Sequence, residues 1–327
     1  MDLETKAHLI SVGTVKLPRS CHPSGPISTA GPGAGENNVF FCSGNRRVRL
    51  GVAERSPLRL VELGGDEVAI MEEGEEVARG HLEAPLFHCP EQAYITVSER
   101  CIYNCKFCAV PKLSGSVKSL EKVVEMVGEA KETGRLKAVS LTSGVEHSPE
   151  EEAFRVAEIV RALRERHIDV PIGVSVTPAF RSSEILKEAG ADEIKYNVEC
   201  LDPEVFKVVC PGVSLDQIKA ALKNAVNVFG RGKVFSNVII GLGESDEALR
   251  KGIDELAEMG VLPGLRAVYP HPLRKGEIMM ERPSKERLLS LAEFTRQALD
   301  RCGLRGDLAK TMCYQCTGCD LIPHRDL

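Results

Sequence analysis

The fold of this chain is decided at residues 92–108, which read QAYITVSERCIYNCKFC. The first half is an apolar run with the length and composition of a buried strand. The second half places Cys101, Cys105 and Cys108, called here the first triplet, in a loop directly after that strand. Three thiols within eight residues are typical of a metal or cluster site, and the loop holds no fourth local ligand of the kind that a closed zinc site needs.

The same pattern of apolar strand, loop and amphipathic helix occurs six times from Gln92 onward. Repeated units of this kind predict parallel strands with right-handed crossovers, and six units instead of eight predict a partial (βα)6 TIM-like barrel of the α/β class. The chemistry of such barrels lies at the C-terminal ends of the strands. The predicted strands run from Ala93 to Val97, Ala138 to Thr142, Ile172 to Val176, Glu193 to Val198, Val234 to Ile240 and Leu265 to Tyr269.

Two smaller parts flank the predicted barrel, which spans residues 89–302. Residues 1–88 read as a small β-rich domain with a turn-rich stretch from Pro18 to Gly35, and residues 303–327 form a short tail. Three glycines between Gly31 and Gly35 could suggest a phosphate loop. No strand leads into them and Pro32 interrupts them, so a flap over a site is favoured.

The composition argues against several functional classes. The formal net charge of -5 leaves no basic excess for binding nucleic acid. No apolar run approaches the ~18 residues of a membrane span. The first residues, with Asp2, Glu4 and Lys6, do not resemble a signal peptide. We therefore expect a cytoplasmic protein that binds neither nucleic acid nor a membrane.

Twelve cysteines in such a chain favour metal or redox chemistry over disulfides, because the cytosol keeps thiols reduced. Three of them, Cys313, Cys316 and Cys319, form a second triplet near the C-terminus. Cys200 and Cys210 are interpreted as small buried residues. The remaining isolated cysteines are Cys21, Cys42, Cys89 and Cys302.

Three cysteines on a 4Fe-4S cluster leave one iron with an open coordination position, and the amino and carboxylate groups of S-adenosylmethionine (SAM) can occupy it. The spacing of the first triplet, with Phe107 before the last cysteine, resembles the signature of the radical SAM superfamily. The alternative is a zinc site completed by His88 or Cys89.

The resemblance covers roughly Gln92 to Cys302 and is closest to biotin synthase-like and lipoyl synthase-like members. It implies that Asn197 and Glu199 hold the ribose and amino group of SAM. Two positions depart from the family pattern, since Ser143-Gly144 lacks the usual following glutamate and Asn237 stands in place of a glycine. The cofactor-binding residues that the resemblance implies are Tyr103, Phe107, Ser143, Gly144, Asn197, Glu199, Ile239 and Gly241.

The second triplet predicts an auxiliary 4Fe-4S cluster whose final ligand comes from elsewhere in the chain. The candidates for that ligand are Cys302, Cys21, Cys42, Cys89 and His324. A zinc knuckle completed by Cys302 or His324 is the alternative.

A barrel with a cysteine tail resembles the two-component, archaeal-type lipoyl synthases. The resemblance implies a sulfurtransferase that inserts sulfur into an octanoyl chain on a lipoyl carrier domain, with a second radical SAM protein as partner and a low-potential ferredoxin or flavodoxin as reductant. Ordinary lipoyl synthases carry their auxiliary cysteines before the barrel and a serine ligand near the C-terminus, whereas no serine follows Ser290 here. The alternatives are a peptide or cofactor maturase with an electron-relay cluster, and a zinc-binding scaffold.

Overall fold

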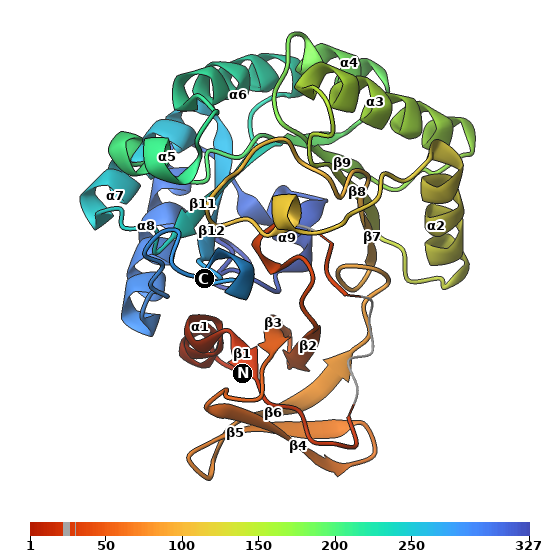
Figure 1. Ribbon diagram of the computed structural model, residues 1–327. Coiled ribbons are helices and arrows are strands. Elements are labelled where there is room, and N and C mark those ends of the chain that lie inside the picture. The colour runs from red at the N-terminus through yellow and green to blue at the C-terminus, as the bar shows by residue number, and fades with distance from the viewer. Residues whose placement is uncertain (22–26, 30) are drawn as a thin grey trace.

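The computed structural model describes residues 1–21, 27–29 and 31–327 of the chain. Two six-stranded sheets dominate it. Helices lie around the outer side of the C-terminal sheet (Figure 1). The predicted turn-rich stretch from Pro18 to Gly35 falls partly outside the described residues, and its described part contains a short 3-10 turn at Gly31–Gly33.

The N-terminal sheet has the strand order β1-β3-β2-β6-β5-β4. A bridge between Lys16 and Arg59 links the segment after β1 to β4, so that the two ends of the sheet meet. Helix α1 (Leu3–Val12), which the sequence did not predict, precedes the sheet and is capped by the side chain of Asp2. The strands are β1 (Thr14–Val15), β2 (Asn38–Ser43), β3 (Arg46–Val52), β4 (Leu58–Gly64), β5 (Glu67–Glu72) and β6 (Glu75–Glu83).

The second sheet confirms the predicted half-barrel. Its strands are parallel and follow one another in chain order, with β7 and β12 at the two edges. The first five strands begin within a residue of the predicted starts. The strands are β7 (Gln92–Thr96), β8 (Ala138–Thr142), β9 (Ile172–Ser175), β10 (Glu193–Lys195), β11 (Val234–Ile240) and β12 (Val261–Ala267).

The sixth strand was predicted too late in the chain, from Leu265 to Tyr269, and the prediction left out the dipeptide Pro263-Gly264. In the structure it lies inside β12, paired with β11. Proline has no N–H to donate to a neighbouring strand and is therefore tolerated in an edge strand. The edge position of β12 accounts for the difference.

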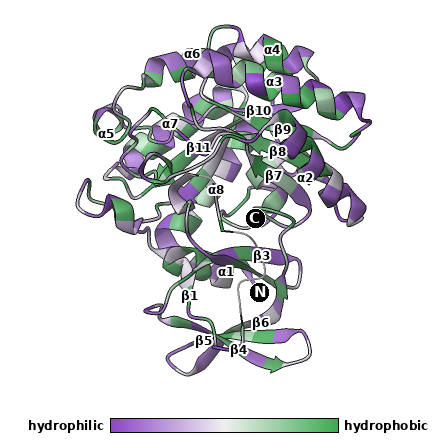
Figure 2. Cartoon of the chain, turned by 45° about the vertical axis from the view of Figure 1, so that its right-hand side comes forward, coloured by the Kyte–Doolittle hydropathy of each residue, from purple (hydrophilic) through white to green (hydrophobic). Residues whose placement is uncertain are grey.

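Most helices of the half-barrel begin at a side-chain cap. Serine side chains cap five of them, for example Ser148, whose side chain accepts a hydrogen bond from the backbone N–H of Glu151. Their apolar faces pack inward on the strands, and polar residues face outward (Figure 2). Of the helices formed by the described residues, none is long and apolar enough to cross a membrane. The helices are α2 (Leu120–Glu132), α3 (Pro149–Glu165), α4 (Ser182–Glu188), α5 (Pro203–Val209), α6 (Leu215–Phe229), α7 (Asp246–Met259) and α8 (Lys285–Arg301).

The tail after α8 turns back into the half-barrel and forms the short helix α9 (Met312–Cys316) against the strands. Thr311 donates to Glu193 of β10 at 2.6 Å, and the Tyr314 hydroxyl donates to the carbonyl of Pro263 at 2.9 Å. Gly173 of β9 leaves room for the tail, since a Cβ there would lie 2.1 Å from the Thr311 hydroxyl.

The N-terminal sheet covers the other side of the tail. The backbone N–H of Arg49 donates to the carbonyl of Gly318 at 2.7 Å, and Arg47 Nη1 donates to the carbonyl of Cys316 at 3.0 Å. Lys6 Nζ reaches the carbonyl of Thr317 at 2.7 Å. The second triplet is thus enclosed between the two sheets.

Candidate functional site

The first triplet lies in the loop after β7, at the C-terminal edge of the half-barrel. Its three thiols are close enough to influence one another electrostatically. Backbone N–H groups of Val145 and Tyr103 point at the sulfur of Cys101, and that of Val110 points at Cys108. Such N–H groups stabilise thiolate ligands of an iron-sulfur cluster. Burial raises the pKa of the Cys108 thiol to about 12 when no metal is bound.

Arg274 holds the loop of the first triplet by hydrogen bonds. Its side chain is fully buried, with Nε donating to the carbonyl of Cys108 at 2.7 Å and Nη1 donating to Asn104 Oδ1 at 2.7 Å. The nearby His271 bonds the carbonyl of Ala34 and caps a 3-10 turn. A lone arginine in a proline-rich loop gives no sequence signal of this bracing role.

Replacing Arg274 should loosen the first cysteine site. We expect Arg274→Met to lower the stability of the loop by about 2–3 kcal/mol, because two buried hydrogen bonds to a charged donor are lost. The measurement is the iron retained after anaerobic reconstitution and challenge with a chelator. Lys275→Met, at an exposed neighbouring position, is the matched control. Equal iron retention in the two variants would contradict the bracing role.

A cavity of ≈ 190 Å³, called here the cluster cavity, opens beside the first triplet. Of the predicted cofactor-binding residues, Ile239 lines a different cavity, described below. Gly241 packs against backbone, where an added Cβ would lie 2.0 Å from the carbonyl oxygen of Glu281. The other six line the cluster cavity: Tyr103, Phe107, Ser143, Gly144, Asn197 and Glu199.

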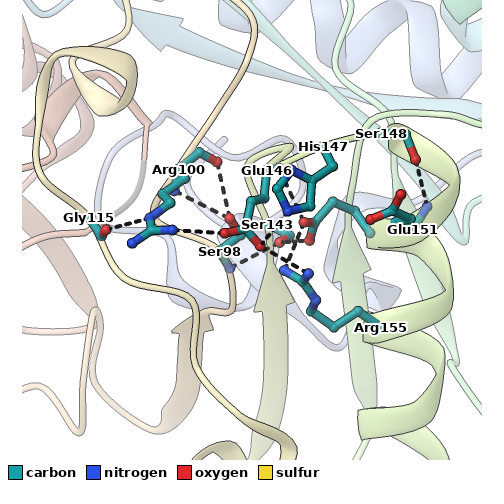
Figure 3. A network of polar contacts seen from close by, with 10 residues as sticks. Ser98, Arg100, Gly115, Ser143, Glu146, His147, Ser148, Glu151 and Arg155 are labelled. Carbon is teal, nitrogen blue, oxygen red and sulfur yellow. Dashed lines mark hydrogen bonds and ion pairs between the residues drawn. The ribbon is translucent and has the colours of Figure 1, made fainter.

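The loop after β8 carries a polar network (Figure 3), and Ser143 and Gly144 of this loop line the cluster cavity. Ser143 Oγ accepts from the backbone N–H of Ser98 at 3.0 Å and donates to the buried carboxylate of Glu152 at 2.7 Å. Glu152 comes from α3 and also binds Arg155 at 3.0 Å. A Cβ on Gly144 would lie 2.2 Å from the carbonyl oxygen of Arg100. The carboxylate of Glu152 therefore holds the loop at Ser143 in place. This is the loop in which the sequence lacks the glutamate that usually follows in the resembled family.

Asn197 and Glu199 follow β10 and are linked to each other. Asn197 Oδ1 accepts from the backbone N–H of Asn237 at 3.1 Å, and the Asn197 side chain hydrogen-bonds Glu199. Glu199 has a left-handed backbone (φ 57°), a strained conformation of a kind that clusters at functional sites. Burial raises the pKa of Glu199 to about 7. A cationic amino group placed beside it would favour the ionised carboxylate.

A second cavity of ≈ 230 Å³, called here the central cavity, adjoins the first. The two share walls that include Thr142, Asn197 and Glu199. On its far side the central cavity is lined by Cys313 and Cys319 of the second triplet. The two cysteine triplets thus line two adjoining cavities that share part of their walls.

Basic side chains surround the end of the central cavity that holds the second triplet. Lys195 Nζ lies 3.8 Å from Cys313 Sγ, and Arg266 faces both Cys313 and Cys319. Arg266 Nη1 is 3.0 Å from a carboxylate oxygen of Asp320, but its buried Nε has no acceptor among the described residues. This end of the cavity is suited to negative charge.

Cys89 lies with the second triplet and not with the first. It is fully buried, its thiol hydrogen-bonds Cys316, and Cys313 and Cys319 are near enough to affect its pKa. The hydrogen bond from Cys89 lowers the pKa of the Cys316 thiol to about 7. The zinc alternative that joined Cys89 to the first triplet is therefore wrong.

Two further residues have contacts that the sequence did not indicate. His88, the other candidate for the first triplet, lines the central cavity with its ring 4.9 Å from that of Tyr94. Cys210 is buried as predicted, but its thiol also hydrogen-bonds Cys105 of the first triplet. No spacing rule links residue 210 to residue 105, so the contact had no sequence signal.

The described side chains do not form a ready-made site for a single metal ion. Within the described part of the chain, no three His, Cys, Asp or Glu side chains converge tightly enough to hold one metal ion. A zinc ion holds its sulfurs at about 2.3 Å, whereas a four-iron cube spreads its cysteine ligands more widely. A zinc ion and a four-iron cluster therefore need differently spaced sulfurs. Neither triplet is arranged tightly enough for a single metal ion.

Comparison with known proteins assigns a family to the region around the first triplet. The family model of the Radical SAM superfamily matches residues 95–256. A lipoyl synthase of Glaesserella parasuis is 29% identical over 181 residues, which cover 53% of this chain and 55% of the relative. The 5-amino-6-(D-ribitylamino)uracil–L-tyrosine 4-hydroxyphenyl transferase 2 of Methanosarcina mazei is 24% identical over 268 residues, covering 76% of this chain and 63% of the relative.

The fold is also similar to that of a solved structure, the maturase HydG of FeFe-hydrogenase. The TM-score is 0.55 at 16% identity, with 64% of this chain and 50% of that chain covered. At that identity the likeness concerns the fold alone. The chain spans about half to two thirds of the length of the curated relatives that it matches.

Proposed function

Residues 95–256 form a radical SAM domain, and on that premise we propose that the protein cleaves SAM reductively and inserts sulfur into an octanoyl chain on a lipoyl carrier protein. The family implies a 4Fe-4S cluster and SAM as cofactors. The auxiliary cluster, the sulfur transfer and the octanoyl substrate are the parts that we propose.

The residues of the first triplet fit the SAM-binding cluster. They offer three thiols with N–H groups directed at the sulfurs, and the cluster cavity extends from them toward Asn197 and Glu199. Glu199 would hold the amino group of SAM by charge, and Asn197 would hold the carboxylate of Glu199 in place. Ser143 and Gly144 would offer backbone groups from a loop that cannot shift.

One observation carries the proposal of sulfur insertion: Cys313 and Cys319 line a cavity that shares walls with the cluster cavity. When bound, SAM and the first cluster supply a hydrogen-abstracting radical, and the second cluster supplies sulfide and takes up the electron left when the carbon–sulfur bond forms. A substrate carbon in the central cavity would lie between the two. The enclosing sheets would keep water from the reacting carbon.

The choice of substrate is supported by the lipoyl synthases among the relatives, which are 27–29% identical over about half of this chain. The partners that follow are an octanoylated lipoyl carrier domain, a second radical SAM protein that adds the other sulfur, and a low-potential ferredoxin or flavodoxin as electron donor. The carrier would deliver its acyl chain into the central cavity.

The test is an anaerobic reaction of the reconstituted protein with SAM, a reductant and an octanoylated carrier domain, with and without a candidate second radical SAM protein. We expect 5′-deoxyadenosine to form and the carrier to gain the mass of sulfur. The same reaction with a non-acylated carrier is the control. Carrier that stays free of sulfur while 5′-deoxyadenosine accumulates would contradict the octanoyl proposal.

A second candidate is a peptide or cofactor maturase in which the auxiliary cluster relays electrons. The completeness of the donor set favours it, because Cys89 stands beside the second triplet and basic side chains surround the site. An electron-relay cluster survives many turnovers, whereas a cluster that donates sulfide is consumed. A colourless, air-stable protein that holds only zinc would exclude both candidates.

A further inference from the structure

The structure assigns Cys89 as the fourth ligand of the auxiliary cluster, so that this cysteine and the second triplet form a closed four-thiolate site. The inference rests on the second cluster of the proposed function, but not on whether that cluster donates sulfur. It deepens the proposal, since a cluster with four thiolate ligands has no iron left open for a substrate to bind.

The position of Cys89 carries the assignment. Cys89 ends the connection between the two sheets, three residues before β7, and its side chain is fully buried. Its thiol hydrogen-bonds the sulfur of Cys316, and the thiols of Cys313 and Cys319 are close neighbours. Cysteines from two distant segments of the chain are therefore neighbours, with Cys89 and Cys316 in direct contact and buried.

A buried hydrogen-bond network links the segment that contains Cys89 to the tail that contains the second triplet. Gln92 Nε2 donates to the carbonyl of Met312 at 2.9 Å, and the Ser140 hydroxyl donates to Gln92 Oε1 at 2.9 Å. The backbone N–H of Met312 donates to the same Ser140 hydroxyl at 3.0 Å. Because Gln92 follows Cys89 closely and Met312 precedes Cys313 directly, the network fixes the position of Cys89 relative to the second triplet.

The other candidates for the fourth ligand are engaged elsewhere. Cys42 donates to a carboxylate oxygen of Glu83 at 2.9 Å. His324 uses both ring nitrogens, one 2.9 Å from Asp300 and the other accepting from the N–H of Gly306. Cys302 caps the end of α8, and Cys21 lies near Glu62 of β4.

The charges around the site match a four-thiolate cluster, which carries net negative charge. Arg47 approaches Cys316, Lys195 approaches Cys313, and Arg266 faces Cys313 and Cys319. Each of these cations is buried or half-buried, so its attraction to the cluster is weakly screened. Such cations offset the cost of burying the cluster charge.

The arrangement also gives the site two sides. Cys313 and Cys319 line the central cavity, whereas Cys89 and Cys316 are buried behind them. Substrate in the central cavity would reach the site from the side of Cys313 and Cys319. Cys89 would anchor the cluster at the back, on the segment that leads directly into β7.

The test uses the full chain with all three cysteines of the first triplet replaced by Ala, so that only the second site takes iron. After anaerobic reconstitution with iron and sulfide, this parent should hold about four irons per chain. Adding Cys89→Ala should lose the cluster or leave a three-iron form, seen by iron analysis and by electron paramagnetic resonance of the oxidised protein. Cys42→Ala and Cys302→Ala, the matched controls, should keep the parent's iron content and spectrum.

Cys89→Ser keeps the size of the side chain and guards against a folding defect. It should retain a cluster whose resonance spectrum is shifted, because an oxygen ligand replaces a sulfur. Parent-like iron content and spectra in both Cys89 variants would overturn the assignment while leaving the second cluster in place. A parent that binds no iron would instead remove the second cluster, and the proposed sulfur insertion with it.

Discussion

We expect formation of 5′-deoxyadenosine to fall to the background level in Cys105→Ala, a loss of at least about a hundredfold. The reason is that Cys105 supplies one of only three thiolates to a cluster whose fourth position must stay open for SAM. With two ligands left, the loop no longer holds the cluster that delivers the electron. The measurement is chromatographic detection of 5′-deoxyadenosine after anaerobic reduction in the presence of SAM.

The contact between Cys105 and Cys210 determines the control for this experiment. Because the Cys210 thiol hydrogen-bonds Cys105, it could replace the missing ligand in the single variant. Cys210→Ala alone should retain SAM cleavage. Residual activity in Cys105→Ala that disappears in the double variant would identify Cys210 as a substitute ligand. Undiminished cleavage in the single and the double variant would exclude the first triplet as the cluster site.

The second large effect is expected in the tail, where Cys316→Ala should abolish sulfur insertion and leave SAM cleavage largely intact. Cys316 belongs to the second triplet and contacts Cys89, but it lies away from the cluster cavity. Its loss removes a ligand of the auxiliary cluster without touching the first. The measurement compares 5′-deoxyadenosine with the sulfur content of the octanoylated carrier in the same reaction.

Cys302→Ala is the matched control for this prediction, since it removes a cysteine at the end of α8 and should change neither product. Sulfur insertion that persists in Cys316→Ala would show that the tail is not the source of sulfur. Loss of both products, in a variant that keeps the first cluster, would instead indicate that the two sites depend on each other for electrons.

Much of the barrel could be predicted from the sequence, because the signals that form it are local. Each strand is a short apolar run rich in β-branched residues, and serine caps such as Ser148 mark where helices begin. The triplet after the first strand, together with the general rule for such barrels, predicted a site at the C-terminal ends of the strands. The sixth strand was predicted without Pro263-Gly264, a dipeptide with the composition of a turn, and only the edge position of β12 makes it a strand.

The other features of the site depend on contacts between distant segments. Cys89 reads as an isolated cysteine until the tail folds back under β7 and brings Cys316 against it. Glu152 reads as an ordinary first-turn acid of α3, yet it supports Ser143 in the loop after β8. Local composition does not predict these contacts, because they form between segments that only the tertiary fold brings together.

The enclosed position of the second triplet also could not be predicted. A tail of this length can lie on the surface of a barrel, and its composition does not distinguish that arrangement from a buried one. Here the fit of Thr311 against Gly173 and the covering strand β3 place the tail between the sheets. That placement gives the second triplet its access to the central cavity, on which the proposed function depends.

The central claim is that the second cysteine site gives sulfur to a substrate held between the two sites. The most direct measurement is a reaction of protein reconstituted with isotopically heavy sulfide, in a buffer that contains ordinary sulfide, followed by mass analysis of the octanoylated carrier. The account predicts heavy sulfur in the carrier and no more than about one product per protein, because the cluster is consumed. Carrier with ordinary sulfur, or sulfur-free carrier alongside abundant 5′-deoxyadenosine, would contradict it.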